Sequence, residues 1–551
     1  MNNKKYPVTD PVKDPNEVYP EVPGINYDDF KLTPKRMPEA QRKRALKQVH
    51  DYESEQKRNF LGYQANQAQS YEKTMGEYLN YHINNIGDPF TSGNYTINSK
   101  FAERAVLDYF ASLWNAQWPH ENTPDAKTDE WKNSYWGYIV SMGCTEANLF
   151  GIWNARDNVS GRATIIDPEN SERAKRASSK GKKFRVMPRT LYYKACASSE
   201  TPNAYTPIAF YSQDTHYSII KAMRILEVDT FNERGSGKYK CPLVYPDDYP
   251  EDYSTEYIDS NGWPFDVPSN DDGSIHIPSL VKLVKFFVEM GHPPMVLFNY
   301  GSTFKGAYDD VEKAIQKIVP ILKKNGLYER EVVYDPETGS SDIRTGYWFH
   351  VDGALAAAYA PFLNMEGIDK VPNFDFRIPE IHSITLSGHK WIGAPWPCGI
   401  YMSKVRYQLE PPDNPNYIGS PDTTFAGSRN GLTALVLWEY LSRNSFEDLI
   451  QKIRTNLKNA QYALKKLQQL EKERGEDLWV EYSPRTLTLR FKEANPDITF
   501  KYSLSGEELY VSGERRSYSH IYIMEHSTKE VIDRFIEDLK AEDAFPEQTQ
   551  G

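Results

Sequence analysis

The chain has few cysteines, no long hydrophobic run and no excess of positive charge. Its four cysteines are widely spaced and form no CxxC or Cys/His pattern, which argues against a zinc site or a disulfide framework and fits a reducing cytoplasm. No apolar stretch approaches the roughly 20 residues of a membrane helix, and residues 1–24 lack the apolar core of a signal peptide. A net charge of −11 argues against nucleic acid as the main partner. We therefore expect a soluble, cytoplasmic protein that binds neither membrane nor nucleic acid.

What the chain does have is enough length for more than one domain. At 551 residues, 39% of them hydrophobic, it can form a large core and at least one smaller domain. Residues 1–40 are rich in Pro, Asp and Glu, and they form either an arm around a neighbouring subunit or a disordered tail. Helical character follows from Pro38 to Asn84. Two polar stretches, 157–204 and 233–275, have the character of insertions, and the sequence suggests no function for either.

A lysine stands at the exit of a short predicted strand. Residues 383–386 alternate like a strand, and Ser-Gly-His breaks the pattern immediately before Lys390. The aromatic and apolar residues on either side desolvate the amine, which lowers its pKa toward the neutral nucleophile that Schiff-base chemistry requires. Taken alone, this window favours a surface lysine in a loop, because lysine is rarely buried.

An aspartate ends a second predicted strand about forty residues upstream. Residues 347–351 have the character of a buried strand, and Asp352 follows them, with the small residues Gly353 and Ala354 behind it. Small residues at this point leave room for a cofactor lying across the strand ends. Pyridoxal phosphate needs two such protein groups, a lysine for the imine and a carboxylate that keeps the pyridine nitrogen protonated. Asp352 and Lys390 together therefore predict a pyridoxal-phosphate site.

At these two stretches the sequence resembles the group II pyridoxal-phosphate-dependent amino-acid decarboxylases. Residues 350–354 match the HVDxA motif of that family, and residues 387–390 match its SxxHK motif. The resemblance extends from about Tyr78 to the C-terminus, outside the two insertions, and is strongest to the histidine and serine decarboxylase branch. It implies fold type I of these transferase-like enzymes, an α/β fold with a mainly parallel sheet in the large domain.

The implied division is an N-terminal arm and helical segment at 1–85, a large cofactor-binding domain at 86–445 and a small C-terminal α+β domain at 446–551. The resemblance further implies a homodimer with its active sites at the interface, and symmetric dimers are the commonest assembly of soluble proteins.

Three further predicted strand exits carry candidate cofactor contacts. Gly143 allows a tight turn before a helix that opens at Cys144 and Thr145, and such a helix start suits a phosphate. These residues alone favour a plain helix cap, and the family usually has more glycine here. His216 matches a family element whose imidazole stacks on the cofactor ring, and Thr303 matches an element beside the cofactor. The carboxyl ends of parallel strands meet at one edge, so we expect all these residues in one crevice.

The resemblance implies ten cofactor contacts and four catalytic residues. The residues expected at the cofactor are Gly143, Cys144, Thr145, His216, Thr303, Asp352, Ala354, Ser387, His389 and Lys390. The residues expected to act in catalysis are Lys390, His216, Asp352 and Tyr417. Tyr417 lies in a polar loop that the family often donates across the dimer interface, where a tyrosine returns a proton to Cα. The alternative for Tyr417 is an ordinary exposed aromatic residue.

The implied reaction releases CO2 from an amino acid and leaves a primary amine. A carbon-carbon lyase would share Lys390, Asp352 and His216, and detection of CO2 rather than an aldehyde fragment separates the two. An aldehyde-forming oxidative deaminase occurs in the family where phenylalanine replaces the loop tyrosine, and Tyr417 argues against it. A scaffold that has lost catalysis would have no reason to keep both Lys390 and Asp352.

The substrate prediction depends on residues 80–90, NYHINNIGDPF. They resemble the NYHLNNWGDPF element of the histidine and serine decarboxylases, with Ile86 in place of tryptophan. If Tyr81, His82 and Ile86 line the side-chain pocket, the smaller isoleucine admits a ring larger than imidazole. We therefore expect tryptophan or another aromatic amino acid first, as in a bacterial aromatic decarboxylase, and histidine second. Serine and glutamate are not expected, and glutamate in particular would need an Arg or Lys to pair with its side-chain carboxylate, which residues 80–90 do not contain.

Overall fold

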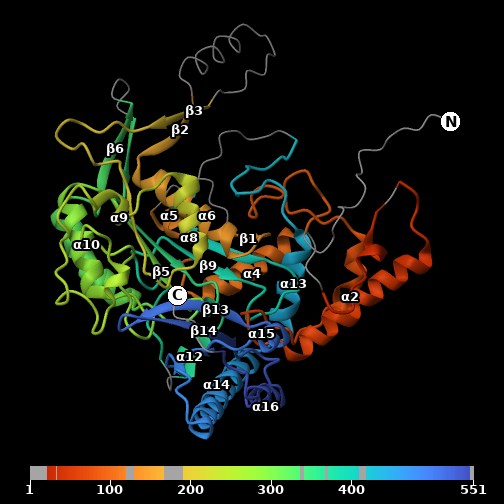
Figure 1. The fold of residues 1–551 in the computed structure, drawn as a ribbon. Coiled ribbons are helices and arrows are strands. Elements are labelled where there is room, and N and C mark those ends of the chain that lie inside the picture. The colour runs from red at the N-terminus through yellow and green to blue at the C-terminus, as the bar shows by residue number, and fades with distance from the viewer. Residues whose placement is uncertain are drawn as a thin grey trace, which may run out of the picture.

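The computed structural model describes residues 22–32, 34–118, 129–166, 190–335, 340–366, 370–408 and 417–546. At its centre lies a six-stranded sheet with the strand order β1-β10-β9-β8-β5-β4 (Figure 1). Its strands are β1 (Tyr135–Val140), β4 (Ile208–Phe210), β5 (Pro294–Asn299), β8 (Trp348–Asp352), β9 (Ser383–Ser387) and β10 (Gly399–Lys404). β4, β5, β8 and β9 pair in parallel, whereas β10 runs antiparallel to both neighbours. The predicted α/β fold with a mainly parallel sheet is confirmed.

Each strand of this sheet alternates its side chains between two layers of helices. On β5, Val296 and Phe298 pack with one layer, and Met295 and Leu297 pack with the other. The first layer contains α4 (Lys100–Leu113), α10 (Ile277–Glu289), α11 (Val311–Lys324) and α13 (Gly431–Ser442), and the second contains α6 (Cys144–Val159) and α8 (Tyr217–Leu226). Because both faces are covered, the central strands β9, β8 and β5 are buried along their whole length.

A second core lies in the C-terminal part of the chain. After the long helix α14 (Phe446–Arg474), an antiparallel sheet with the order β11-β12-β14-β13 packs with two short helices. Its elements are β11 (Glu481–Tyr482), β12 (Thr488–Lys492), α15 (Pro496–Tyr502), β13 (Ser505–Val511), β14 (Glu514–Tyr522) and α16 (Lys529–Asp538). These elements have the α+β character expected there, and the domain boundaries at 85/86 and 445/446 stay a prediction.

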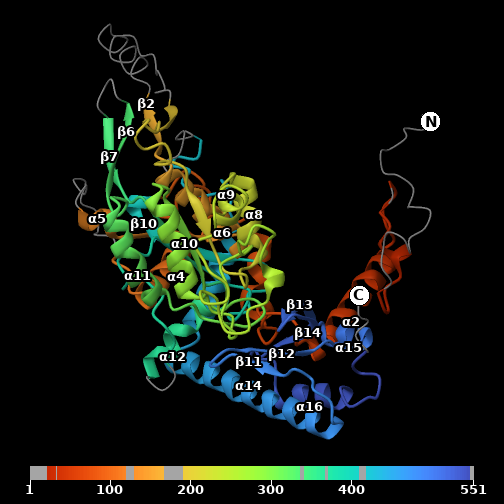
Figure 2. The ribbon, with the colours of Figure 1, turned by 60° about the vertical axis from the view of Figure 1, so that its left-hand side comes forward.

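The N-terminal helix α2 (Glu39–Asn59) lies against the C-terminal elements rather than the large sheet. It contacts α15 and α16, and Figure 2 shows it beside α15. The backbone N–H of Leu61 donates to the carbonyl of Tyr502, and the N–H of Tyr522 donates to the carbonyl of Leu61. The two ends of the chain therefore meet in one layer beneath the large domain. Most of the predicted arm, residues 1–21, lies outside the described residues.

The two predicted insertions differ in how they join the fold. α6 continues through Val159, so the first insertion begins later in the chain than expected. It forms a hairpin of β2 (Arg162–Ile166) and β3 (Thr190–Lys194), and its basic middle at 167–189 lies outside the described residues. The second stretch, 233–275, packs into the main core, where Trp263 and Val267 are fully buried. It is an integral part of the large domain and not an addition to its surface.

The remaining elements connect these layers. The helices are α3 (Glu72–Met75), α5 (Asp129–Asn133), α9 (Phe231–Gly235) and α12 (Ala360–Glu366), the strands are β6 (Arg330–Asp335) and β7 (Ser340–Arg344), and the 3-10 turns are η1 (Tyr27–Phe30), η2 (Gly76–Asn80), η3 (Thr255–Tyr257), η4 (Ala356–Ala358) and η5 (Val405–Tyr407). In the part of the chain that the structure describes, no helix is both long and apolar enough to cross a membrane.

Candidate active site

The strand exits that carry the predicted residues meet at one edge of the large sheet. Asn299 at the end of β5 is in register with Asp352 at the end of β8, and Asp352 is in register with Thr385 on β9. On the far side of the antiparallel β10, β1 ends at Val140 in the row that holds the end of β9. The loops after β1, β4, β5, β8 and β9 therefore open on the same edge, as expected for parallel strands.

Lys390 lies three residues beyond the end of β9 and is half-buried. Burial lowers the pKa of its ammonium group, and the nearby Asp352 and Cys144 oppose that shift. Among the described residues its Nζ has no hydrogen-bond or ion-pair partner. An amine in this setting loses its proton more readily than an exposed lysine, which suits it to bond with an aldehyde carbon.

Asp352 is buried and both oxygens of its carboxylate accept hydrogen bonds. Oδ1 accepts from the backbone N–H of Ala354 at 3.1 Å, and Oδ2 accepts from Asn148 Nδ2 at 2.7 Å. Both donors are N–H groups, so both carboxyl oxygens act as acceptors. Sequence reasoning missed Asn148, although it lies four residues after Cys144 and therefore on the same face of α6.

His216 is the N-cap of α8. Its Nδ1 lies 2.8 Å from Ser218 Oγ and also accepts from the backbone N–H of Ser218. Burial lowers the pKa of this imidazole, Asp352 raises it, and Lys390 lowers it further. A neutral imidazole beside Asp352 and Lys390 can stack on an aromatic ring held between them.

At the start of α6, the backbone N–H groups of Cys144 and Thr145 have no hydrogen-bond acceptor among the described residues. Its N-cap is Gly143, with φ 72°, and no side chain caps the helix. A side chain at Gly143 would also collide with the ring of His389, whose Cε1 lies 2.9 Å from the position of a Cβ atom. The first N–H groups of an uncapped helix favour an anion. The start of α6 therefore suits the predicted phosphate site at Gly143, Cys144 and Thr145, and it is not a helix start capped by a side chain.

Two further predicted residues are held close to this edge by the backbone. The N–H of Ser387 donates to the carbonyl of Ala354 at 3.0 Å, which joins the ends of β8 and β9. His389 Nδ1 lies 3.0 Å from the carbonyl of Cys398. Burial raises the pKa of the Cys144 thiol to about 12, so this residue stays protonated near Lys390.

Thr303 is held from both ends of the chain. Its carbonyl accepts hydrogen bonds from Gln64 Nε2 at 2.8 Å and from Tyr522 Oη at 2.6 Å. Gln64 precedes the large domain and Tyr522 lies in the C-terminal sheet, so neither was evident from local sequence pattern. The loop after β5 is therefore shaped by three separate parts of the chain.

Tyr417 and the predicted substrate segment lie apart from this cluster within the single chain. Tyr417 is 77% exposed, and its carbonyl accepts a hydrogen bond from Asn94 Nδ2 at 3.4 Å. Tyr81 is 61% exposed, His82 is exposed and Ile86 is half-buried. No contact recorded for the described residues joins these four side chains to Lys390.

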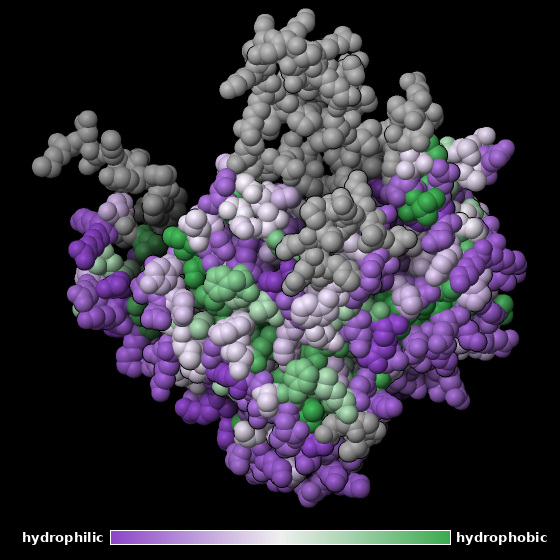
Figure 3. Space-filling view, turned by 180° about the vertical axis from the view of Figure 1, so that it is seen from behind, coloured by the Kyte–Doolittle hydropathy of each residue, from purple (hydrophilic) through white to green (hydrophobic). Residues whose placement is uncertain are grey.

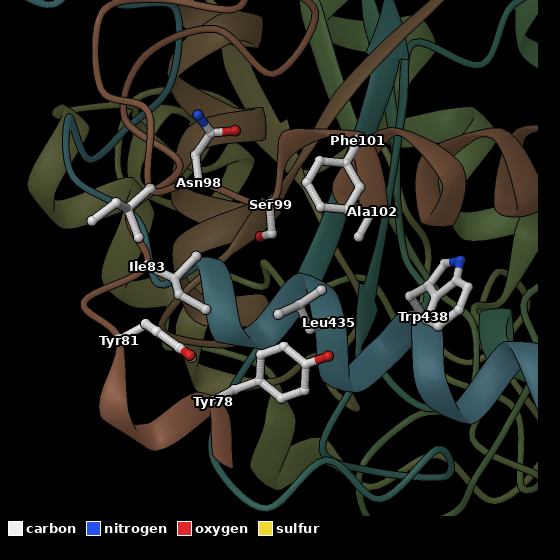
Figure 4. A pocket seen from close by; sticks show the side chains of 10 residues that line it. Tyr78, Tyr81, Ile83, Asn98, Ser99, Phe101, Ala102, Leu435 and Trp438 are labelled. Carbon is white, nitrogen blue, oxygen red and sulfur yellow. The ribbon is translucent and has the colours of Figure 1, made fainter. Parts of the chain in front are cut away.

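Tyr81 instead lines an apolar pocket of about 430 Å³ on the outer face of α13 (Figure 4). Its lining includes Tyr78 and Ile83 from the predicted substrate segment, Phe101 from the start of α4 and Trp438 from α13. No residue of the Lys390 cluster belongs to this lining.

Pyridoxal phosphate fits the residues that the sheet edge brings together. Lys390 offers an amine with a lowered pKa, Asp352 offers a carboxyl group that accepts two N–H bonds, and the start of α6 offers open N–H groups. These are the groups that bind the aldehyde, the ring nitrogen and the phosphate of this cofactor.

Comparison with known proteins points the same way. Residues 265–481 match the family model described as the pyridoxal-dependent decarboxylase conserved domain. The chain is 28% identical over 492 residues to a histidine decarboxylase of Solanum lycopersicum, covering 89% of this chain and 86% of that protein. It is also 28% identical over 466 residues to serine decarboxylase 3 of Oryza sativa subsp. japonica, covering 84% and 74%.

Solved structures add a more similar relative. L-methionine decarboxylase from Streptomyces sp. 590, in complex with L-methionine methyl ester, is 40% identical to this chain with a TM-score of 0.81. The match covers 94% of this chain and 98% of that chain. Lactobacillus brevis glutamate decarboxylase, at 16% identity and a TM-score of 0.58, shares the fold.

Proposed function

Because the chain belongs to the family of pyridoxal-dependent decarboxylases, we propose that it converts an L-amino acid with an uncharged side chain, L-methionine first, into the corresponding amine and CO2. The enzyme is a carboxy-lyase and pyridoxal 5'-phosphate is its cofactor. The observation that carries the activity is the meeting of Lys390 and Asp352 at one sheet edge, beside the open start of α6.

Each residue of the proposed active site is assigned one task. When bound, pyridoxal phosphate supplies an aldehyde that captures amines and a ring that takes up the electron pair left by departing CO2. Lys390 holds the aldehyde carbon until substrate arrives, and Asp352 keeps a proton on the ring nitrogen. His216 covers one face of the ring, and the first N–H groups of α6 hold the phosphate. Tyr417 returns a proton to Cα.

The substrate side chain is proposed from the relatives. The methionine decarboxylase matches nearly the whole chain at 40% identity, whereas the histidine decarboxylase matches at 28%. A flexible thioether is easily accommodated by apolar residues, and Ile86 is apolar where the segment of the histidine and serine enzymes has an indole. The histidine decarboxylases favour histidine as a second candidate. A ring larger than imidazole stays a prediction based on Ile86.

A panel of amino acids tests this proposal. The holoenzyme is given methionine, norleucine, tryptophan, phenylalanine, histidine and glutamate, and CO2 and amine are both quantified. We expect methionine to have the highest kcat/KM, with norleucine nearest to it because only the sulfur is replaced. Apolar pockets separate similar side chains by about 10- to 200-fold. Histidine or tryptophan faster than methionine would overturn the substrate assignment, and aldehyde without CO2 would overturn decarboxylation.

The assembly proposed is a homodimer in which a second copy covers the pocket of Figure 4. Phe101, Tyr81 and Trp438 expose large apolar side chains there, and clustered exposure of this kind marks an interface. Apolar patches also stand out on the otherwise hydrophilic face in Figure 3. A shared active site would account for the exposure of Tyr417. We also propose that the enzyme works in the reducing cytoplasm, which its four free cysteines favour.

Two variants that should form little or no amine test the shared site. In a dimer whose sites combine residues of both copies, mixing Lys390→Ala with Tyr417→Phe and allowing subunits to exchange restores part of the amine-forming activity. Phe101→Glu should give a monomer in analytical ultracentrifugation. A mixture with no more amine formation than either variant alone would contradict a site shared between copies.

A further inference from the structure

Asn148 is a fully buried amide whose every hydrogen-bonding position is used. Its Nδ2 donates to Asp352 Oδ2 at 2.7 Å and to Ser218 Oγ at 3.1 Å. Its Oδ1 accepts from Thr385 Oγ1 at 3.0 Å and lies 3.1 Å from His350 Nε2. An amide has two donor hydrogens and two acceptor lone pairs, so these four contacts fill its capacity.

The direction of these bonds follows from Trp348 at the far end of the array. An indole N–H can only donate, and Trp348 Nε1 donates to Ser383 Oγ at 3.2 Å. The Ser383 hydroxyl then has its own proton to give, and His350 Nδ1 lies 2.7 Å away. Burial lowers the pKa of His350 to about 4, so the ring is neutral. A neutral ring that accepts at Nδ1 donates from Nε2, and the acceptor there is Asn148 Oδ1.

This polarity determines the state of Asp352. With Oδ1 of Asn148 turned toward His350 and Thr385, its Nδ2 faces Asp352, whose two oxygens both accept N–H bonds, the pattern that a carboxylate makes. A protonated Asp352 would suit the reverse orientation of the amide, with every bond in the array reversed as far as Ser383. The backbone N–H of Ala354 reinforces the first arrangement, because it too can only donate.

The second hydrogen of Asn148 Nδ2 acts on His216 through the hydroxyl of Ser218. Ser218 Oγ accepts from Asn148 and lies 2.8 Å from His216 Nδ1, to which it donates its proton. The backbone N–H of Ser218 also points at this nitrogen, at 3.3 Å. His216 Nδ1 is therefore the acceptor, and its remaining proton sits on Nε2.

We propose that Asn148 is a positioning residue that keeps Asp352 ionised and His216 in its Nε2–H tautomer, and so prepares two sides of the cofactor site through one amide. This rests on the assignment of Asp352 and His216 to the cofactor ring, made above. It adds a residue, and an array running from Asn148 to Trp348, that local motifs do not reveal.

Other charged and titratable groups act on Asp352 without replacing Asn148. They are Lys390 after β9, His216 before α8, His350 on β8 and Cys144 at the start of α6. Among the described residues, only Asn148 and the backbone of Ala354 donate hydrogen bonds to the carboxylate. Loss of the amide therefore leaves Asp352 with one donor.

The test is Asn148→Asp, which keeps the shape of the side chain. It places two carboxyl groups at hydrogen-bond distance, and in a buried site they share one proton instead of both ionising. In the reconstituted enzyme we expect the visible absorbance of bound cofactor to gain a step between about pH 5 and pH 9. A shared proton also leaves Asp352 with less negative charge to hold the ring nitrogen, and a weaker charged hydrogen bond there should weaken cofactor binding about 10- to 100-fold at neutral pH. Both readouts are independent of substrate.

Asn154→Asp is the matched control. Asn154 is buried in the same helix, but its Nδ2 donates to the carbonyl of Phe150 and to Tyr401 Oη, away from the cluster. The Asn154→Asp variant therefore shows the destabilisation that any buried carboxyl group causes in α6. An absorbance profile and a cofactor Kd that are the same for Asn148→Asp and Asn154→Asp would overturn the proposal.

A measurement on the apoenzyme reads the tautomer of His350 in the wild-type chain itself. In 15N NMR of histidine side chains, the signal of His350, assigned by its absence in His350→Gln, should report the Nε2–H tautomer near neutral pH. An Nδ1–H tautomer would require the reverse polarity of the array and would overturn the proposal. Ser218→Ala should alter the His216 signal, while the absorbance of bound cofactor should keep its wild-type pH profile. A pH profile altered as in Asn148→Asp would contradict the idea that Asn148 acts on His216 through Ser218 and on Asp352 directly.

Discussion

Replacing Arg429 with methionine should cost the folded protein about 3 to 5 kcal/mol, because it leaves the carboxylate of Glu103 buried without a counter-charge. The side chains of Arg429 and Glu103 are 1% and 0% exposed. The guanidinium donates to Glu103, to the carbonyl of Gly87 at 3.0 Å and to the carbonyl of Ile139 at 3.3 Å.

Glu103 holds the other half of the same network. It accepts from Asn85 Nδ2 at 2.9 Å and from the backbone N–H of Ile139 at 2.9 Å. The pair therefore ties α4 and β1 to residues 85–87 of the predicted substrate segment. Arg429→Met breaks this connection without adding a polar group.

The expected change in melting temperature follows from the size of the chain. Unfolding entropy is about 2.1 cal/mol/K per residue, or about 1.2 kcal/mol/K for 551 residues. A loss of about 3 to 5 kcal/mol therefore lowers Tm by about 3 to 4 °C. Arg515→Met on the exposed Arg515–Glu508 pair is the matched control and should leave Tm essentially unchanged, because exposed ion pairs contribute little.

A double-mutant cycle separates the pair from its surroundings. Apoprotein Tm is measured by circular dichroism for Arg429→Met, for Glu103→Leu and for both together. The double variant should recover much of the loss, because no unpaired charge remains buried. Additive losses, or a loss of less than about 1 kcal/mol for Arg429→Met, would refute the reasoning.

Three further outcomes are expected from the site and from the buried histidines. Asp352→Asn should bind cofactor but lose several orders of magnitude in kcat, since a neutral amide does not hold the proton on the ring nitrogen; retained turnover would mean that Asp352 serves only the fold. Tyr417→Phe should release CO2 at a comparable rate but yield aldehyde, ammonia and hydrogen peroxide in place of much of the amine, because slow return of the proton to Cα gives oxygen time to react; an unchanged amine yield without peroxide would assign that proton to another acid. Burial lowers the pKa of His526 to about 4, below its unfolded value of about 6.5. Its contribution to stability is therefore complete above about pH 6.5 and is lost as pH falls toward 4. The Tm of His526→Gln should fall less steeply than that of the wild type over that range, and parallel curves would contradict this assignment.

Local sequence patterns revealed the residues that follow strand ends. Lys390 and Asp352 were predictable because a strand, a turn and a polar residue lie within a few positions of one another, and parallel strands bring such exits to one edge. Asn148 was not, because its partners Ser218, His350 and Asp352 lie 70, 202 and 204 residues away. A window on one helix cannot contain that information.

Composition misled where burial came from distant parts of the chain. Residues 233–275 are polar and rich in turns, which predicted an insertion, yet Trp263 is fully buried within the main core. Thr303 matched a family element, but its position depends on Gln64 and Tyr522. Tyr81 and Tyr417 remain exposed in one chain, so their predicted roles depend on a second copy that no single chain contains.

The central claim, that Lys390 holds the cofactor, is tested most directly by borohydride reduction of the holoenzyme and mass spectrometry of its peptides. The lowered pKa of Lys390, whose Nζ lies near Asp352 and has no hydrogen-bond partner in the described part of the chain, predicts that the reduced cofactor is attached to the peptide containing Lys390. Lys390→Ala should fold, purify without the visible colour and yield no labelled peptide. Attachment to a different lysine in the wild-type enzyme, or coloured Lys390→Ala with wild-type turnover, would contradict the account.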